Sequence, residues 1–212
     1  MYIRSIFFIS LLLLVIQSRV FSEDRQLWHT NTVEATLMDF WKVGVENQYR
    51  WENGVSDLFQ YYIQGYVGFR LNPACFVTLN CRQNWRKIEK KDGTSIWEDT
   101  VEPLIDLENS YKVAGLTVKN RSRFQYVTGS KDWLYRNRVL VSANILPFSP
   151  YVSDEIFLKD FSTYQQNRFE VGIQPSLFGI FSANVAYMRR SIRRSGEWVN
   201  ENVLRTGVEL SF

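Results

Sequence analysis

Regular alternation of apolar and polar side chains is the feature that most constrains how this chain folds. A period of two sends successive side chains to opposite faces of a β-strand. The segment Trp41 to Trp51 shows it most clearly, with mainly aromatic or β-branched odd positions and mainly polar even positions. The pattern recurs down to Leu204–Phe212, and Gly, Pro, Asn and Asp separate the segments. The chain is therefore predicted to be all-β.

The length and charge of these segments point to a membrane barrel. Many approach or exceed the roughly 9–11 residues of a tilted membrane strand, whereas globular strands cluster near 5–6. Long charged side chains recur on the polar face, as expected behind a lipid-facing apolar band. We predict an antiparallel up-and-down transmembrane β-barrel of ten to twelve strands. About eleven segments can be counted, starting near Leu27, although bacterial single-chain barrels usually have an even number. A soluble periplasmic lipocalin-like ligand-binding barrel is the alternative, because its strands also alternate.

The first 22 residues read as a signal peptide. Arg4 supplies the positive start, Ile6–Ile16 is an apolar run, and cleavage is expected after Ser22. The run is shorter than the roughly 20 residues that span a bilayer as a helix. Residues 23–212 would then form one barrel domain in the outer membrane of a Gram-negative bacterium. Without Arg4 and Arg19, 23 basic residues face 22 acidic ones, a net charge of +1. No concentrated basic face indicates nucleic-acid binding.

The connections between segments suggest an orientation. Those at 72–73, 110–115, 146–150 and 175–179 look tight, and those at 52–57, 87–96, 128–132, 159–163 and 191–199 look longer or more polar. Outer-membrane barrels place short turns in the periplasm and longer loops outside. This orientation predicts an aromatic girdle near the outer strand ends, formed by Trp51, Trp85, Trp97, Trp133 and Trp198.

Four short motifs, rich in inward-facing arginine, carry a resemblance to a known family. They are Arg121-Ser-Arg-Phe-Gln-Tyr126, Leu134-Tyr-Arg-Asn-Arg138, Pro150-Tyr-Val-Ser-Asp-Glu-Ile-Phe157 and Gln166-Asn-Arg-Phe-Glu-Val-Gly172. From about residue 27 to its end, the chain resembles the bacterial outer-membrane barrels of domain of unknown function 2490. It differs in having Gln125 where the family often has an acidic residue, and in a longer connection between the fourth and fifth strands. The resemblance implies a membrane barrel without an established activity, which we describe as porin-like only in its fold.

The polar faces of the strands predict a charge network in the lumen. A barrel of this size has little internal room, and buried charges need partners. The network either fills and rigidifies the interior or lines a narrow conduit that prefers anions, because bases outnumber acids. Its predicted members are Lys42, Glu46, Arg50, Arg70, Arg82, Glu102, Asp106, Arg121, Arg123, Arg136, Arg138, Glu155, Arg168, Glu170, Arg205 and Glu209, with Lys119 and Glu108 on the same face.

Nothing in the sequence identifies a catalytic centre. His29 is the only histidine, and it shares its strand face with Leu27 and Val33, so it should point outward. Acyl-ester chemistry needs a nucleophile, a base and an orienting group, and no serine can be paired with His29 from the sequence. A lipid-modifying outer-membrane enzyme stays an alternative. No cofactor or metal is indicated, since no CxxC or histidine cluster is present.

Two further surface features suggest partners. Arg189, Arg190, Arg193 and Arg194 form the densest basic patch, and arginine forks suit the phosphates of lipopolysaccharide. The last strand alternates apolar residues up to Leu210 and Phe212. This pattern looks like the signal read by the outer-membrane barrel assembly machinery.

Overall fold

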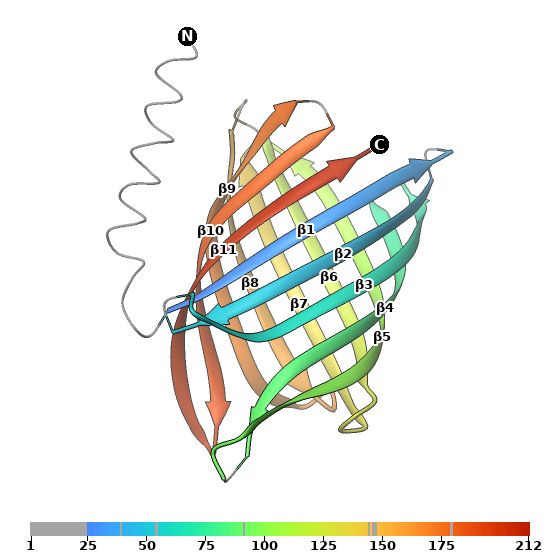
Figure 1. Ribbon diagram of the computed structural model, residues 1–212. Coiled ribbons are helices and arrows are strands. Elements are labelled where there is room, and N and C mark those ends of the chain that lie inside the picture. The colour runs from blue at the N-terminus through green and yellow to red at the C-terminus, as the bar shows by residue number, and fades with distance from the viewer. Residues whose placement is uncertain are drawn as a thin grey trace, which may run out of the picture.

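Eleven long β-strands make up nearly all of the part of the chain that the structure describes (Figure 1). The computed structural model describes residues 25–212 except 39, 54, 91, 144, 146, 147 and 179, and leaves out the side chains of 176–178. The predicted signal peptide lies outside the described residues. The strands are β1 (Arg25–Leu37), β2 (Trp41–Glu52), β3 (Asp57–Asn72), β4 (Cys75–Glu89), β5 (Ser95–Val113), β6 (Leu116–Val127), β7 (Asp132–Ala143), β8 (Phe148–Lys159), β9 (Thr163–Phe178), β10 (Phe181–Arg194) and β11 (Glu197–Ser211).

The strands close into one barrel in which each pairs with its sequence neighbours. All consecutive pairs are antiparallel, and the barrel closes by parallel pairing of β1 with β11, from Arg25 opposite Asn202 to Glu34 opposite Ser211. The predicted barrel of ten to twelve strands is confirmed. The even count usual for bacterial barrels is not met, and an odd count in up-and-down order makes the first and last strands parallel.

The connections lie at two rims. Among the described residues, the C-terminal rim holds residues 38, 40, 73–74, 114–115, 145, 180 and Phe212. The charged rim holds the described residues 53, 55–56, 90, 92–94, 128–131, 160–162 and 195–196. Two hairpins use a residue followed by glycine with positive φ at both positions, Ala114-Gly115 and Ser195-Gly196. This is the type I′ pattern that matches strand twist.

Two of the connections expected to be longer, 87–96 and 191–199, are largely strand. Residues 87–89 and 95–96 continue β4 and β5, and residues 191–194 and 197–199 continue β10 and β11. The sequence suggested loops because polar residues replace the apolar face there. Pairing nevertheless continues, so these hairpins extend the barrel wall at the charged rim.

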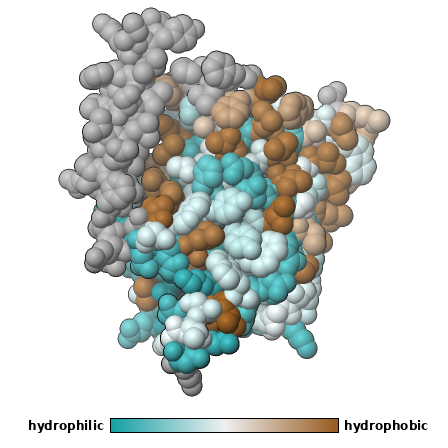
Figure 2. Space-filling view, in the orientation of Figure 1, coloured by the Kyte–Doolittle hydropathy of each residue, from teal (hydrophilic) through white to brown (hydrophobic). Residues whose placement is uncertain are grey.

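The outer surface is apolar over a broad band. Its exposed side chains include Val33, Val45, Val67, Leu79, Ile105, Val139 and Val171. Figure 2 shows such side chains mainly over the upper part of the visible face, while hydrophilic residues gather toward the lower end. No helix in the described ranges is long and apolar enough to cross a membrane.

Aromatic side chains cluster near the charged rim, where the predicted girdle lies. Tyr61 stacks on Trp85 with ring centroids 4.8 Å apart and meets Trp97 at 5.4 Å. Trp133 packs against Tyr126, and Trp198 packs against Tyr164. Rings of this kind, with an apolar body and a polar tip, suit a membrane–water interface.

Candidate functional site in the lumen

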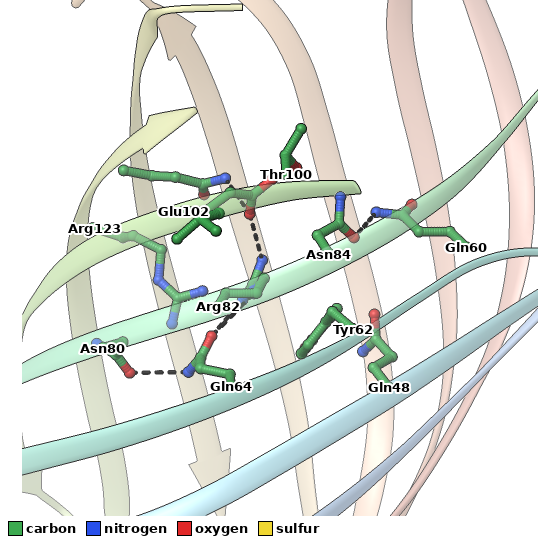
Figure 3. Close-up of polar contacts among 12 residues, drawn as sticks. Gln48, Gln60, Tyr62, Gln64, Asn80, Arg82, Asn84, Thr100, Glu102 and Arg123 are labelled. Atoms are coloured by element: carbon green, nitrogen blue, oxygen red, sulfur yellow. Dashed lines mark hydrogen bonds and ion pairs between the residues drawn. The ribbon is translucent and has the colours of Figure 1, made fainter. Parts of the chain in front are cut away.

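The strand register turns the predicted charged residues to the inside of the barrel. Arg82 lies opposite Glu102, Asp106 opposite Arg123, and Glu155 opposite both Arg138 and Arg168. One long interior face therefore runs from strand to strand, as the period-two pattern requires. The close-up in Figure 3 shows Arg82, Glu102, Gln64 and Asn80 reaching toward one another from neighbouring strands.

The best-formed ion pair joins β5 to β6. Arg123 donates from Nε to Asp106 Oδ1 and from Nη2 to Asp106 Oδ2, each over 2.6 Å. Both residues are buried. This two-pronged geometry is the strong arrangement for arginine and carboxylate, because it satisfies both oxygens.

Glu155 is shared by several arginines. It accepts hydrogen bonds from Arg136 Nη2 and Arg121 Nη2, both at 2.9 Å, and lies 3.5 Å from Arg168 Nη1. Its exposed fraction is 5%. One carboxylate thus compensates three guanidinium groups, so this part of the lumen carries a surplus of positive charge.

Glu170, on the neighbouring strand β9, is a second shared carboxylate. It accepts hydrogen bonds from Tyr151 Oη at 2.6 Å and from Arg205, and Arg138 Nη2 lies 3.5 Å away. These contacts link β7, β8, β9 and β11 through one buried carboxylate. The wall therefore includes polar links beyond the backbone ladder.

Aromatic rings sit between the arginines, which the sequence did not lead us to expect. Trp28 is 1% exposed and lies inside the barrel. The Cζ atoms of Arg50, Arg168 and Arg190 lie 4.0, 5.0 and 5.5 Å from its ring. Guanidinium groups favour the face of an aromatic ring, and more so when desolvated. The alternation already placed Trp28 on the inward face of β1, but a tryptophan there was not recognised as part of the network.

Apolar residues also fill the lumen. Leu104, Met188 and Val203 are almost completely buried, and Trp28, Met188 and Val203 pack as one cluster. We use the name septum for the buried residues at this level: Trp28, Tyr62, Arg82, Leu104, Arg123, Arg136, Glu155, Phe157, Met188 and Val203. All of them are buried.

Two cavities lie on either side of the septum and share no lining residue. The vestibule, toward the C-terminal rim, has a volume of about 450 Å³ and is lined by both signs of charge, including Lys42, Glu46, Arg70, Arg121 and Glu209. The arginine pocket, toward the charged rim, has a volume of about 180 Å³ and is lined by Arg50, Arg82, Arg136, Arg168 and Glu102, among others. The lumen therefore holds two separate cavities, one toward each rim.

The predicted network residues in the vestibule are more exposed than those of the septum. Lys42 pairs with Glu34 at 2.6 Å, and Tyr62 Oη donates to Glu46 at 2.6 Å. Arg70 is exposed, and the Lys119–Glu108 pair is stretched to 3.9 Å with both side chains nearly half exposed. The vestibule is therefore an open polar chamber rather than a packed core.

His29 points outward, as the strand pattern predicted, and belongs to a chain of polar side chains across the β11–β1–β2 seam. Its Nδ1 lies 2.9 Å from Thr206 Oγ1, its Nε2 lies 3.0 Å from Asn31 Oδ1, and Asn31 Nδ2 donates to Asn47 Oδ1. A hydroxyl, an imidazole and an amide in this order could form a nucleophile, base and orienting group. However, β11 is paired on both sides here, so its backbone N–H groups are engaged in the sheet and leave none to bind an oxyanion.

The basic patch at the end of β10 is divided by the strand alternation. Arg190 and Arg194 are on the inward side and both pair with Glu201, at 2.9 and 2.6 Å. Arg189 and Arg193 are exposed on the outer face. Strand alternation therefore turns the four arginines to opposite faces of β10, and whether any of them contacts lipopolysaccharide stays a prediction.

The last strand shows the predicted face pattern. Leu210 lies opposite Val33 of β1, and the Phe212 side chain is 63% exposed. The Phe212 backbone N–H donates to the Glu34 carbonyl at 3.0 Å. Whether the assembly machinery reads these residues stays a prediction. In the described ranges, no group of three or more His, Cys, Asp or Glu side chains is placed to hold a metal ion.

Comparisons with known proteins agree with this architecture. A family described as "Protein of unknown function (DUF2490)" matches residues 25–201. The crystal structure of the beta domain of the Bordetella autotransporter Brka is similar with a TM-score of 0.52 and 13% identity, over 84% of this chain and 86% of that one. OmpT of Vibrio cholerae matches with a TM-score of 0.39 and 11% identity, over 76% of this chain and 60% of that one. No curated protein sequence matches the chain. The first likeness shows that this chain shares the fold of that autotransporter beta domain.

Proposed function

This chain belongs to the DUF2490 family of proteins of unknown function, and we propose that it is an integral outer-membrane barrel with a closed lumen. The observation that carries the proposal is the septum, whose buried arginines, carboxylates and rings fill the barrel between two separate cavities. The barrel would then present a binding chamber at each rim instead of a continuous pore.

The outer surface supports residence in a membrane. A broad band of exposed aliphatic and aromatic side chains surrounds the barrel, and such a band would be costly to expose to water. A soluble lipocalin-like barrel would bury its apolar face inward, whereas here most of the buried residues are polar or charged and the apolar face is outside. The inside-out pattern therefore favours the membrane barrel.

The orientation follows from the two rims. Charged residues crowd the charged rim, including Lys87, Asp92, Lys131, Asp160 and Glu197. The aromatic cluster lies just inside this rim. We place the charged rim outside the cell and the C-terminal rim in the periplasm, as in barrels whose more polar hairpins project outward.

Cellular location is tested by membrane fractionation combined with gel mobility. The folded barrel should be found in the outer-membrane fraction and should migrate differently before and after heating, because a closed barrel resists detergent until it is heated. Recovery in the soluble periplasm with unchanged mobility would contradict the proposal and support the lipocalin-like alternative.

Closure of the lumen is tested by conductance in planar bilayers. The septum predicts little or no steady current from the purified wild-type protein. Large, stable channels would contradict closure, and an anion preference in them would support the narrow conduit, because bases outnumber acids along the lumen.

A further inference from the structure

Among the cavities of the described chain, the arginine pocket has an unusual charge balance. Four arginines line it, Arg50, Arg82, Arg136 and Arg168, together with a single carboxylate, Glu102. Glu155 does not line the pocket but pairs with Arg136 and Arg168, and it also pairs with Arg121. Even if Glu155 is assigned wholly to the pocket, two positive charges remain without a compensating acid. Buried charge of one sign is costly unless a counter-charge is bound.

Arg50 shows the surplus most plainly. Its Nε donates to Gln48 Oε1 at 2.6 Å and its Nη1 donates to Gln60 Oε1 at 2.8 Å. Both of these partners are neutral amides, and Arg50 is 8% exposed. Its guanidinium is stacked on Trp28, which holds it in place without neutralising it.

Buried donors in the pocket wall also lack partners. Gln166 is 8% exposed, and its Nε2 has no hydrogen-bond partner among the described residues because its Oε1 is turned to Arg190. The Nε of Arg168 is likewise buried without a partner within the described ranges. Unsatisfied buried donors cost free energy, and an acceptor in the cavity would satisfy them.

We propose that the arginine pocket binds a phosphate group, either as the free ion or at the end of a small phosphate ester. Two surplus charges match a phosphate dianion, and guanidinium forks match its oxygens. The volume of about 180 Å³ accommodates a phosphate group with some water but excludes a large ligand. The pocket lies next to the charged rim, which the proposed function places outside the cell, so the ligand would arrive from outside. Only this direction of entry rests on the proposed function.

Calorimetry on the full mature protein in a non-ionic detergent tests the proposal. Inorganic phosphate and glycerol phosphate are titrated separately, and binding of either supports the pocket. Binding of both assigns it to a terminal phosphate group, and binding of inorganic phosphate alone assigns it to the free ion. Heat-modifiable mobility in the gel first confirms that the barrel is folded. If neither ligand binds to this folded barrel, the proposal is overturned, while the evidence for a closed membrane barrel is unaffected.

Two variants and one control locate the site. Gln60→Glu adds a carboxylate beside Arg50 with almost no change in shape, so it should weaken phosphate binding at least about tenfold while leaving the barrel folded. Arg50→Gln should weaken it similarly by removing a charge. Arg70→Gln, an exposed arginine of the vestibule, should leave binding unchanged. Loss of binding in the Arg70 variant, or unchanged binding in Gln60→Glu, would exclude the arginine pocket as the site.

Discussion

The Glu155→Gln variant gives the sharpest test of the septum. Glu155 is 5% exposed, accepts hydrogen bonds from Arg136 and Arg121 at 2.9 Å, and lies 3.5 Å from Arg168. A glutamine of the same shape removes the only charge that these arginines share at this point and turns an amide N–H₂ toward one of them. Removing one partner of a buried ion pair costs about 3–5 kcal/mol. We expect a loss of free energy of unfolding in that range.

Glu108→Gln is the matched control in the same lumen. Its partner Lys119 is 3.9 Å away, and the Glu108 side chain is 42% exposed. Pairs of this kind contribute about 0–1 kcal/mol. Urea unfolding from lipid vesicles, followed by tryptophan fluorescence, measures both variants under one condition.

The pairwise origin of the effect can be checked with a second substitution. Adding Arg136→Met to Glu155→Gln removes one of the uncompensated charges. The double variant should therefore lose less free energy of unfolding than the sum of the losses in the two single variants. Equal and small losses for the Glu155 and Glu108 variants would refute the reasoning, since they would show a hydrated lumen in which burial has no electrostatic cost.

Three other predictions concern the septum, the outer seam and the wall. Trp28→Ala should raise bilayer conductance above the wild-type level, because it removes the ring on which three arginines stack; unchanged conductance would mean that the ring does not seal the lumen. His29→Ala should leave lipid release from outer-membrane extracts unchanged, and an activity lost in this variant would establish a hydrolase. Gly44→Ala should destabilise the barrel, since a Cβ there would lie 2.4 Å from the Tyr66 ring, whereas Gly65→Ala, with open space around it in the described structure, should not; equal urea midpoints would contradict this.

The period-two pattern was sufficient to predict most of the interior surface. It placed Arg82, Asp106, Arg123 and Glu155 on inward faces, and the register agrees. It also pointed His29 outward. These assignments succeed because alternation along a strand is a local property of the backbone.

The same pattern also placed two apolar residues on inward faces, and we did not recognise them as part of the interior. Leu104 lies between Glu102 and Asp106 on the inward face, and Met188 lies two residues before the inward Arg190. By alternation alone both belong in the lumen. We expected a polar interior, whereas a narrow barrel also needs compact apolar side chains to fill the space between its arginines.

The sequence by itself determined the membrane-barrel class, the approximate position of most strands and the face of most charged side chains, because these depend on spacing along one strand. The tertiary structure alone decided the parallel closure of β1 on β11, the sharing of Glu155 among three arginines, and the two cavities beside the septum. Each of these depends on strand number and register around a closed cylinder, where a shift of one strand by a single residue would change every cross-strand contact.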